Sequence, residues 1–239
     1  MATSDGLHHI ELLNGEMAPI AVRRSARARR ISLRIDPAGG QVVLTLPEHV
    51  RIGEGLAFAE QQSGWISGRL ATLPPRVRFD DGVEIPILGE AHIIRHDPAA
   101  KAGVWRASGT LWVSGAEEFI ERRVSDFLKA EARREIRPRA REKYARLRAS
   151  QARPLGRVTL RDTSSRWGSC SPRGDLNFSW RLVLAPESVL DYVVAHEVAH
   201  LAHMDHSPRF WKVCAELTEA VEEPRRWLRR NAARLMRYG

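Results

Sequence analysis

The chain has few cysteines and no long apolar segment, and each scarcity excludes a class of protein. Among 239 residues there are two cysteines, Cys170 and Cys214, which are too few for a disulfide framework. No stretch approaches the roughly 20 apolar residues of a membrane-spanning helix, and the first residues lack the apolar run of a secretory signal. We therefore expect reduced cysteines, a cytoplasmic location and no membrane partner.

Lysine is scarce as well, so arginine supplies nearly all of the net charge of +9. Only four of the 38 basic residues are lysines: Lys101, Lys129, Lys143 and Lys212. An arginine excess beside abundant alanine is typical of GC-rich coding. The positive charge therefore permits contact with nucleic acid without establishing it.

The basic residues form three clusters along the chain, at 23–30, 122–148 and 225–237. Acidic residues intersperse the middle cluster, which is therefore predicted to be an ion-paired, solvated helix face. The first and last clusters are the candidate sites for nucleic acid. The chain has no glycine-rich phosphate-binding loop.

The pattern of apolar residues predicts a β-rich accessory region over residues 1–115. With 43% hydrophobic residues the chain can form a core. A helix is expected over 53–73, although Gly64 and Gly68 weaken it. The expected short strands are 18–23, 31–35, 41–46, 83–88, 91–96, 103–106 and 110–113.

The second half of the chain is predicted to contain more helix, and no internal repeat stands out. A helical stretch over 116–149, kinked or interrupted at Pro138, connects the accessory region to residues 150–239. In this last region, strands at 157–171 and 175–180 precede a helix that begins near Pro186. The expected fold class is therefore α+β.

The most informative pattern is His196-Glu197-Val198-Ala199-His200. Residues four apart share one face of a helix, so His196 and His200 can bind one zinc ion. Glu197 projects beside them, and a carboxylate near zinc but not bound to it can take a proton from zinc-bound water. Two buried histidines on an ordinary helix would match the same pattern, but the helical sequence upstream favours a metal site.

A catalytic zinc ion needs a third protein ligand, and four residues follow within reach: His203, His206, Glu216 and Glu219. His203 continues the stripe of the first two histidines, and three ligands in line on a straight helix cannot surround one ion. His206 is favoured, because Ser207-Pro208 is typical of a new helix start and predicts a turn near 204–205. The two glutamates remain alternatives, with exposed helix acids as their other interpretation.

Several segments of the catalytic half together resemble the YgjP-like metallopeptidase family, whose relatives include the SprT-like zincins. The matching segments are 166–171, 176–177, 182–186, 191–197, 206–207 and 210–211. The resemblance extends more weakly through the N-terminal half. It implies that His196, His200 and His206 bind zinc, that Glu197 is the catalytic acid/base, and that 150–239 is a zincin-like catalytic region. Asp205 departs from the asparagine common in the family, and it either orients a ligand imidazole or caps the turn.

We therefore expect a zinc metallopeptidase that uses one Zn²⁺ and Glu197 to hydrolyse a polypeptide substrate. Two alternatives stay open: a metal-dependent hydrolase of nucleoside triphosphates or other phosphoanhydrides, and a nucleic-acid-binding module with structural zinc. Glu197 argues against the module, because a structural zinc site does not need an unbound carboxylate. The sequence does not indicate the oligomeric state.

Residues around the expected metal helix suggest further roles. The strands at 157–180 offer an edge to which an extended peptide could add, or they merely cover the helix. Tyr192, Arg166 and Arg209 are candidate donors for transition-state stabilisation, and none of them can be assigned. Cys170 is expected to be a packing thiol rather than a nucleophile.

Overall fold

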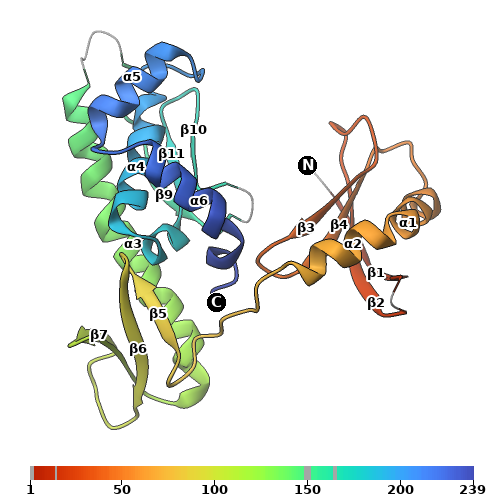
Figure 1. Cartoon of the computed structure of the whole chain (residues 1–239), viewed down its shortest axis with the longest axis horizontal. Helices are drawn as coiled ribbons and strands as arrows, with labels where there is room; N and C mark the ends of the chain where they lie inside the picture. The colour runs from red at the N-terminus through yellow and green to blue at the C-terminus, as the bar shows by residue number, and fades with distance from the viewer. Residues whose placement is uncertain (1–2, 14, 148–151, 164–165) are drawn as a thin grey trace. The chain divides into compact units, whose positions relative to one another are not determined.

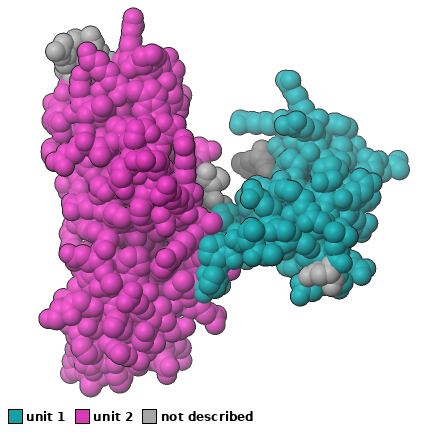
Figure 2. Space-filling model, viewed as in Figure 1, with its two compact units in different colours: residues 1–76 teal, residues 77–239 magenta. Residues whose placement is uncertain are grey.

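The computed structural model describes residues 3–13, 15–147, 152–163 and 166–239. The chain divides into two compact units, residues 1–76 and 77–239, which Figure 2 distinguishes by colour. The border lies within the predicted accessory region 1–115. The strands after residue 77 therefore share a compact unit with the helix that contains His196, called the histidine helix below.

The N-terminal unit contains a four-stranded sheet (Figure 1). Its strands are β1 (Thr3–Glu11), β2 (Met17–Arg24), β3 (Ser32–Asp36) and β4 (Gln41–Leu46), in the order β1-β2-β4-β3. The central strands β2 and β4 are parallel, and each outer strand is antiparallel to its neighbour. Three of these strands confirm the predictions, whereas β1 is not predicted from the sequence.

Two short helices cover this sheet, α1 (Ile52–Gln61) and α2 (Ser63–Ala71). The prediction of one continuous helix over 53–73 is wrong, because the chain leaves helical geometry at Gln62 (φ −97°, ψ 12°). α1 approaches β4 so closely that a Cβ at Gly55 would lie 2.5 Å from Leu46 Cδ2. Glycine at this position therefore lets the helix pack on the core of the unit.

The second unit begins with another four-stranded sheet, which has the same topology as the first. Its strands are β5 (Glu84–Ile87), β6 (Glu90–Asp97), β7 (Val104–Ala107) and β8 (Thr110–Ser114), in the order β5-β6-β8-β7. Again the central strands are parallel and the outer pairs antiparallel. The predicted strands are confirmed, and the repeat lies in topology rather than in recognisable sequence similarity.

A 27-residue helix, α3 (Ile120–Arg146), follows the one-turn η1 (Glu117–Phe119). α3 contacts β7 and β8 of the second sheet and also the histidine helix, which carries His196. It continues through Pro138, which lies on the exposed face, so the predicted interruption does not occur. Its predicted end at residue 149 lies outside the described residues.

A small third sheet precedes the histidine helix. Its strands are β9 (Val158–Arg161), β10 (Gly168–Cys170) and β11 (Leu176–Ser179), in the order β10-β11-β9. The predicted strand 157–171 is therefore two strands, with β10 antiparallel and β9 parallel to β11. The predicted turn is confirmed, since Gly174 N donates to Ser171 O at 2.9 Å.

The chain ends in η2 (Trp180–Leu184) and three helices, α4 (Glu187–Ala199), α5 (Pro208–Leu217) and α6 (Glu222–Leu235). α4 contacts α3, α5 and α6 and contributes buried residues on several sides. The architecture is thus α+β, as the sequence predicts. Among the described residues, no helix is both long enough and apolar enough to cross a membrane.

Candidate metal centre

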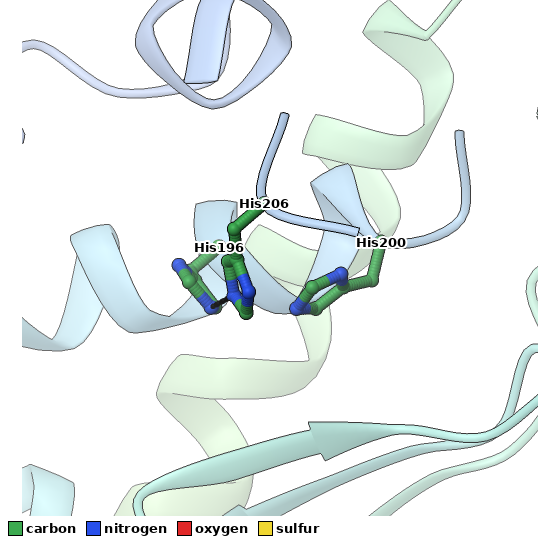
Figure 3. A group of neighbouring side chains, drawn as sticks. All are labelled: His196, His200 and His206. Carbon is green, nitrogen blue, oxygen red and sulfur yellow. Dashed lines mark hydrogen bonds between the residues drawn. The ribbon is translucent and has the colours of Figure 1, made fainter. Parts of the chain in front are cut away.

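Three histidines meet at the C-terminal end of α4 (Figure 3). One nitrogen from each of His196, His200 and His206 lies within 4.8 Å of the others. The Nε2 atoms of His196 and His206 are 3.2 Å apart. Nitrogen ligands about 2.0–2.1 Å from a tetrahedral zinc ion lie roughly 3.3 Å from one another. The cluster is therefore consistent with a site for one metal ion.

α4 positions two of these imidazoles one above the other. His196 is in its last turn, and His200 is the C-cap residue with helical dihedral angles (φ −64°, ψ −19°). His200 Nδ1 lies 3.0 Å from the carbonyl oxygen of His203. Because a carbonyl only accepts, Nδ1 carries the proton and Nε2 is free to bind a metal.

His206 comes from the turn after α4, where the sequence predicts one. Ser207 caps α5 by accepting from Phe210 N at 3.5 Å, and Pro208 is the first helical residue. The Asp205 carboxylate accepts a hydrogen bond from Ser207, which lowers the pKa of this exposed carboxyl. Of the two roles weighed for Asp205, the structure favours stabilisation of the turn.

The other three candidate ligands lie outside the cluster. Within the described part of the chain, the group that could hold a metal consists of His196, His200 and His206. The side chains of His203 and Glu216 line a different cavity, together with Arg209. Glu219 lines another cavity, beside Lys143.

Glu197 is buried between α4 and the edge strand β10, with 6% of its surface exposed. A Cβ at Gly168 would lie 2.5 Å from both Glu197 Cγ and Oε1, so this close approach requires glycine. Burial raises the pKa of Glu197 to about 8, opposed by the nearby charge of Arg166. The packing role of Gly168 is not predicted from the sequence, although a glycine within a strand is a recognised sign of close approach.

The surroundings favour the neutral form of two of the imidazoles, those of His196 and His200. Burial, together with the neighbouring histidines, lowers the pKa of His196 to about 4. Burial also lowers the pKa of His200. Neutral imidazoles have a free lone pair at neutral pH, which metal binding requires. The donor set and its electrostatics therefore both fit a divalent cation.

An aromatic side chain packs directly against the cluster. The ring of Phe210, which is fully buried, has its centroid 4.9, 4.6 and 4.9 Å from those of His196, His200 and His206. This contact is not predicted from the sequence, because the spacing of Phe210 gives no sign of it. The contact restricts the orientations of all three imidazoles.

Two cavities flank Glu197 and His196. The smaller, of about 210 Å³, is lined in part by Tyr192, and the larger, of about 380 Å³, by Arg166 and Cys170. Arg209 lines neither. Two of the three candidate donors therefore lie beside the site.

The Cys170 thiol borders the larger cavity without being activated. Burial, and secondarily the charge of Glu197, raises the pKa of Cys170 to about 11. A thiol with such a pKa is protonated at neutral pH and is a weak nucleophile. The prediction of a packing role agrees with this.

A buried ion pair holds α4 in place. Lys143 Nζ, from α3, lies 2.7 Å from Asp191 Oδ1 and 2.6 Å from the carbonyl oxygen of Leu217. Thr218 Oγ1 donates to the other Asp191 oxygen at 2.8 Å. The network ties α3 and the end of α5 to the helix that carries His196.

Comparison with known families gives one match: a model described as "YgjP-like, metallopeptidase domain" matches residues 29–231. The matched range includes all three histidines and Glu197. Neither the curated proteins nor the solved structures gave a match.

Proposed function

The chain belongs to the YgjP-like metallopeptidase family, and on this premise we propose that it is a zinc-dependent peptidase that hydrolyses peptide bonds. The observation that carries the proposal is a buried carboxylate, Glu197, beside three convergent imidazoles and an edge strand. A structural zinc site would not need such a carboxylate.

His196, His200 and His206 are the residues that would hold the metal. Three nitrogen ligands with room for a further ligand are typical of catalytic zinc, and this is the reason for proposing zinc over other divalent metals. Bound there, zinc supplies an acidified water molecule and a Lewis acid for the substrate carbonyl.

Glu197 is the proposed general base. Burial raises its pKa to about 8, and a cation held beside it would lower that pKa toward the range where proton transfer is efficient. Its Oε atoms take the proton of the attacking water and return it to the leaving nitrogen. Gly168 keeps the carboxylate in place by allowing β10 to pack against it.

Strand β10 is the proposed substrate wall. It is an edge strand, and Gly168, Ser169 and Cys170 line the larger cavity together with His206. An extended peptide that pairs with this edge gains main-chain hydrogen bonds and lies across the histidine cluster. This arrangement favours a polypeptide over a compact ligand.

The test is a Glu197→Gln variant assayed on unfolded polypeptide. We expect it to retain bound zinc and its unfolding temperature but to lose about 10²–10⁴-fold in turnover, because the general base is gone. Glu216→Gln, at an exposed acid of α5 outside the cluster, is the matched control and should cleave normally. Wild-type cleavage by the Glu197 variant would exclude the mechanism.

Phosphoanhydride hydrolysis is a second candidate, favoured by the position of Arg166 in the larger cavity. An arginine there could hold a phosphate. Nucleotide turnover that depends on Glu197, without proteolysis of a broad peptide mixture, would make this candidate the better one.

We also propose nucleic acid as a partner, contacted by α6. Residues 224–239 contain no acidic side chain, and four arginines there are exposed: Arg226, Arg229, Arg230 and Arg234. Such a surface attracts phosphates irrespective of sequence.

A further inference from the structure

The smaller cavity beside Glu197 has the dimensions of a side-chain pocket. Its volume is about 210 Å³, below the roughly 300–1,000 Å³ of sites that hold a whole small molecule. It lies where α4, α6 and the start of β10 meet. Because Glu197 and His196 form part of its wall, whatever fills it lies next to the reacting bond.

The lining of this cavity is mostly apolar apart from the two residues of the proposed catalytic centre. Trp167, Val193 and Leu228 line it, together with Gly168 and with Tyr192, whose hydroxyl is the other polar group. The larger cavity, in contrast, contains Arg166 and two more imidazoles. A charged side chain in the smaller cavity would lose its hydration without gaining a partner of its own, whereas an apolar side chain gains from burial.

The hydrogen bonds of β10 show which way its free edge points. Trp167 O accepts from Ser179 N at 2.8 Å, and Ser171 N donates to Asp175 O at 2.9 Å. Alternate residues of an antiparallel strand face the same neighbour, so 167, 169 and 171 face β11 and Gly168 and Cys170 face outward. The outward peptide groups are those available to a substrate.

The direction of β10 sets the direction of a bound peptide. Gly168, the first residue of the strand, lines both cavities; Trp167 just before it lines only the smaller one, and Ser169 and Cys170 after it line only the larger one. Antiparallel pairing is the more stable arrangement, and it makes the substrate run the opposite way. Residues that follow the scissile bond then lie at the smaller cavity.

We infer that the smaller cavity is a specificity pocket that binds an apolar side chain of the substrate residue immediately after the scissile bond. This inference rests on the proposed peptidase function. Leu228, which is 8% exposed and comes from α6, is the lining residue best suited to set the size of the accepted side chain, since it lies outside both β10 and the histidine helix.

The experiment is cleavage of a randomised peptide mixture by zinc-loaded full-length protein, with the products sequenced by mass spectrometry. We expect leucine, isoleucine, valine, methionine or phenylalanine after the cut, at least about tenfold over charged residues. Leu228→Phe should fill the pocket and shift selection toward smaller residues, and Leu228→Ala should shift it toward larger ones. Leu13→Phe, the same change at an exposed leucine of the N-terminal unit, should alter nothing.

The outcomes separate the pocket from the activity. Cleavage without a preference for apolar residues after the cut, or with a preference that neither Leu228 variant changes, contradicts the inferred specificity pocket. Either result leaves the proposed peptidase function standing. An apolar preference only before the cut contradicts the inferred direction. Absence of any cleavage by zinc-loaded wild type contradicts the proposed function, and the pocket with it. Bound zinc and unfolding temperature show that each variant is folded.

Discussion

The two four-stranded sheets have the same strand order and the same pairing, yet only the second belongs to the unit that contains the histidine cluster. After the first sheet the chain forms two short helices that pack on that sheet's own core. After the second it forms α3, which contacts both the sheet and α4. The difference teaches that the helix following each sheet decides what the sheet is joined to, and α3 joins the second sheet to the helix of the candidate site.

α3 makes that connection through two ion pairs, one near the middle of the helix and one in its last turn. Glu131, only 4% exposed, pairs with Arg106 of β7 at 3.2 Å. Lys143 pairs with Asp191 of α4 at 2.7 Å. Each pair joins α3 to another element, so the helix holds the second sheet and the histidine helix in one unit.

The largest expected effect is the loss of zinc affinity when one of the three proposed histidine ligands of the second unit is replaced. His206→Ala should lower zinc affinity by more than about 100-fold, since loss of a direct ligand exceeds the 10–100-fold cost of losing a supporting hydrogen bond. His203→Ala should keep zinc, because the hydrogen bond to His200 Nδ1 comes from the main-chain carbonyl of His203, which the substitution retains. His9→Ala, in the N-terminal unit, should also keep it.

Metal analysis and competition with a chelator measure these affinities. Normal zinc content in His206→Ala, together with loss in Glu216→Ala, would refute the ligand assignment.

Breaking the ion pair between α3 and α4 should lower the stability of the second unit. Lys143→Met leaves Asp191 partly buried without its cation, and removing one partner of a buried pair costs about 3–5 kcal/mol. Denaturant unfolding of the zinc-free protein measures the loss. The double variant Lys143→Met/Asp191→Leu should recover part of it, whereas an unchanged free energy of unfolding in Lys143→Met would show that the pair does not hold α4.

Equivalent core leucines of the two sheets sharpen the comparison further. Leu44 of β4 pairs with Val22, and Leu111 of β8 pairs with Ile94, all four side chains being buried. Truncation of either leucine to alanine should cost about 2–5 kcal/mol in its own unit. Zinc should raise the stability of the second unit in Leu111→Ala. It should leave the stability of the N-terminal unit in Leu44→Ala unchanged, because a ligand stabilises only the state that binds it.

Calorimetric scans with and without zinc test this pair. Equal stabilisation of both variants by zinc would mean that the two units unfold together.

The parts of the molecule that could be predicted from the sequence are those set by local geometry. His196, Glu197 and His200 follow from helical spacing, and the return of His206 follows from the helix start at Ser207-Pro208. Most strands follow from alternating apolar residues. The break at Gln62 is not evident, because apolar residues continue at helical spacing across it.

Long-range packing accounts for what the sequence did not predict. The repeated topology is hidden because many sequences satisfy the same alternation of buried and exposed residues. Leu228 reaches the pocket from a helix that begins more than 20 residues after Glu197, and no local pattern indicates that contact. Phe210 likewise looks like any core aromatic until its neighbours are known.

The smallest expected effect compares the basic clusters of the two units. In the N-terminal cluster, Arg24 is already engaged, since it donates to the carbonyl oxygens of Glu48 and Val50 at 2.9 Å. The α6 arginines Arg226 and Arg230 are exposed one helical turn apart and can reach neighbouring phosphates.

Arg226→Gln/Arg230→Gln should therefore weaken nucleic-acid binding several-fold and reduce the slope of log affinity against log salt by about 0.9 per lost phosphate contact on duplex DNA. Arg27→Gln/Arg29→Gln, the matched change in the N-terminal unit, should have the smaller effect. Fluorescence anisotropy with labelled duplex at several salt concentrations measures both, and an equal loss in the two variants would show diffuse attraction by the net charge of the chain rather than a surface on α6.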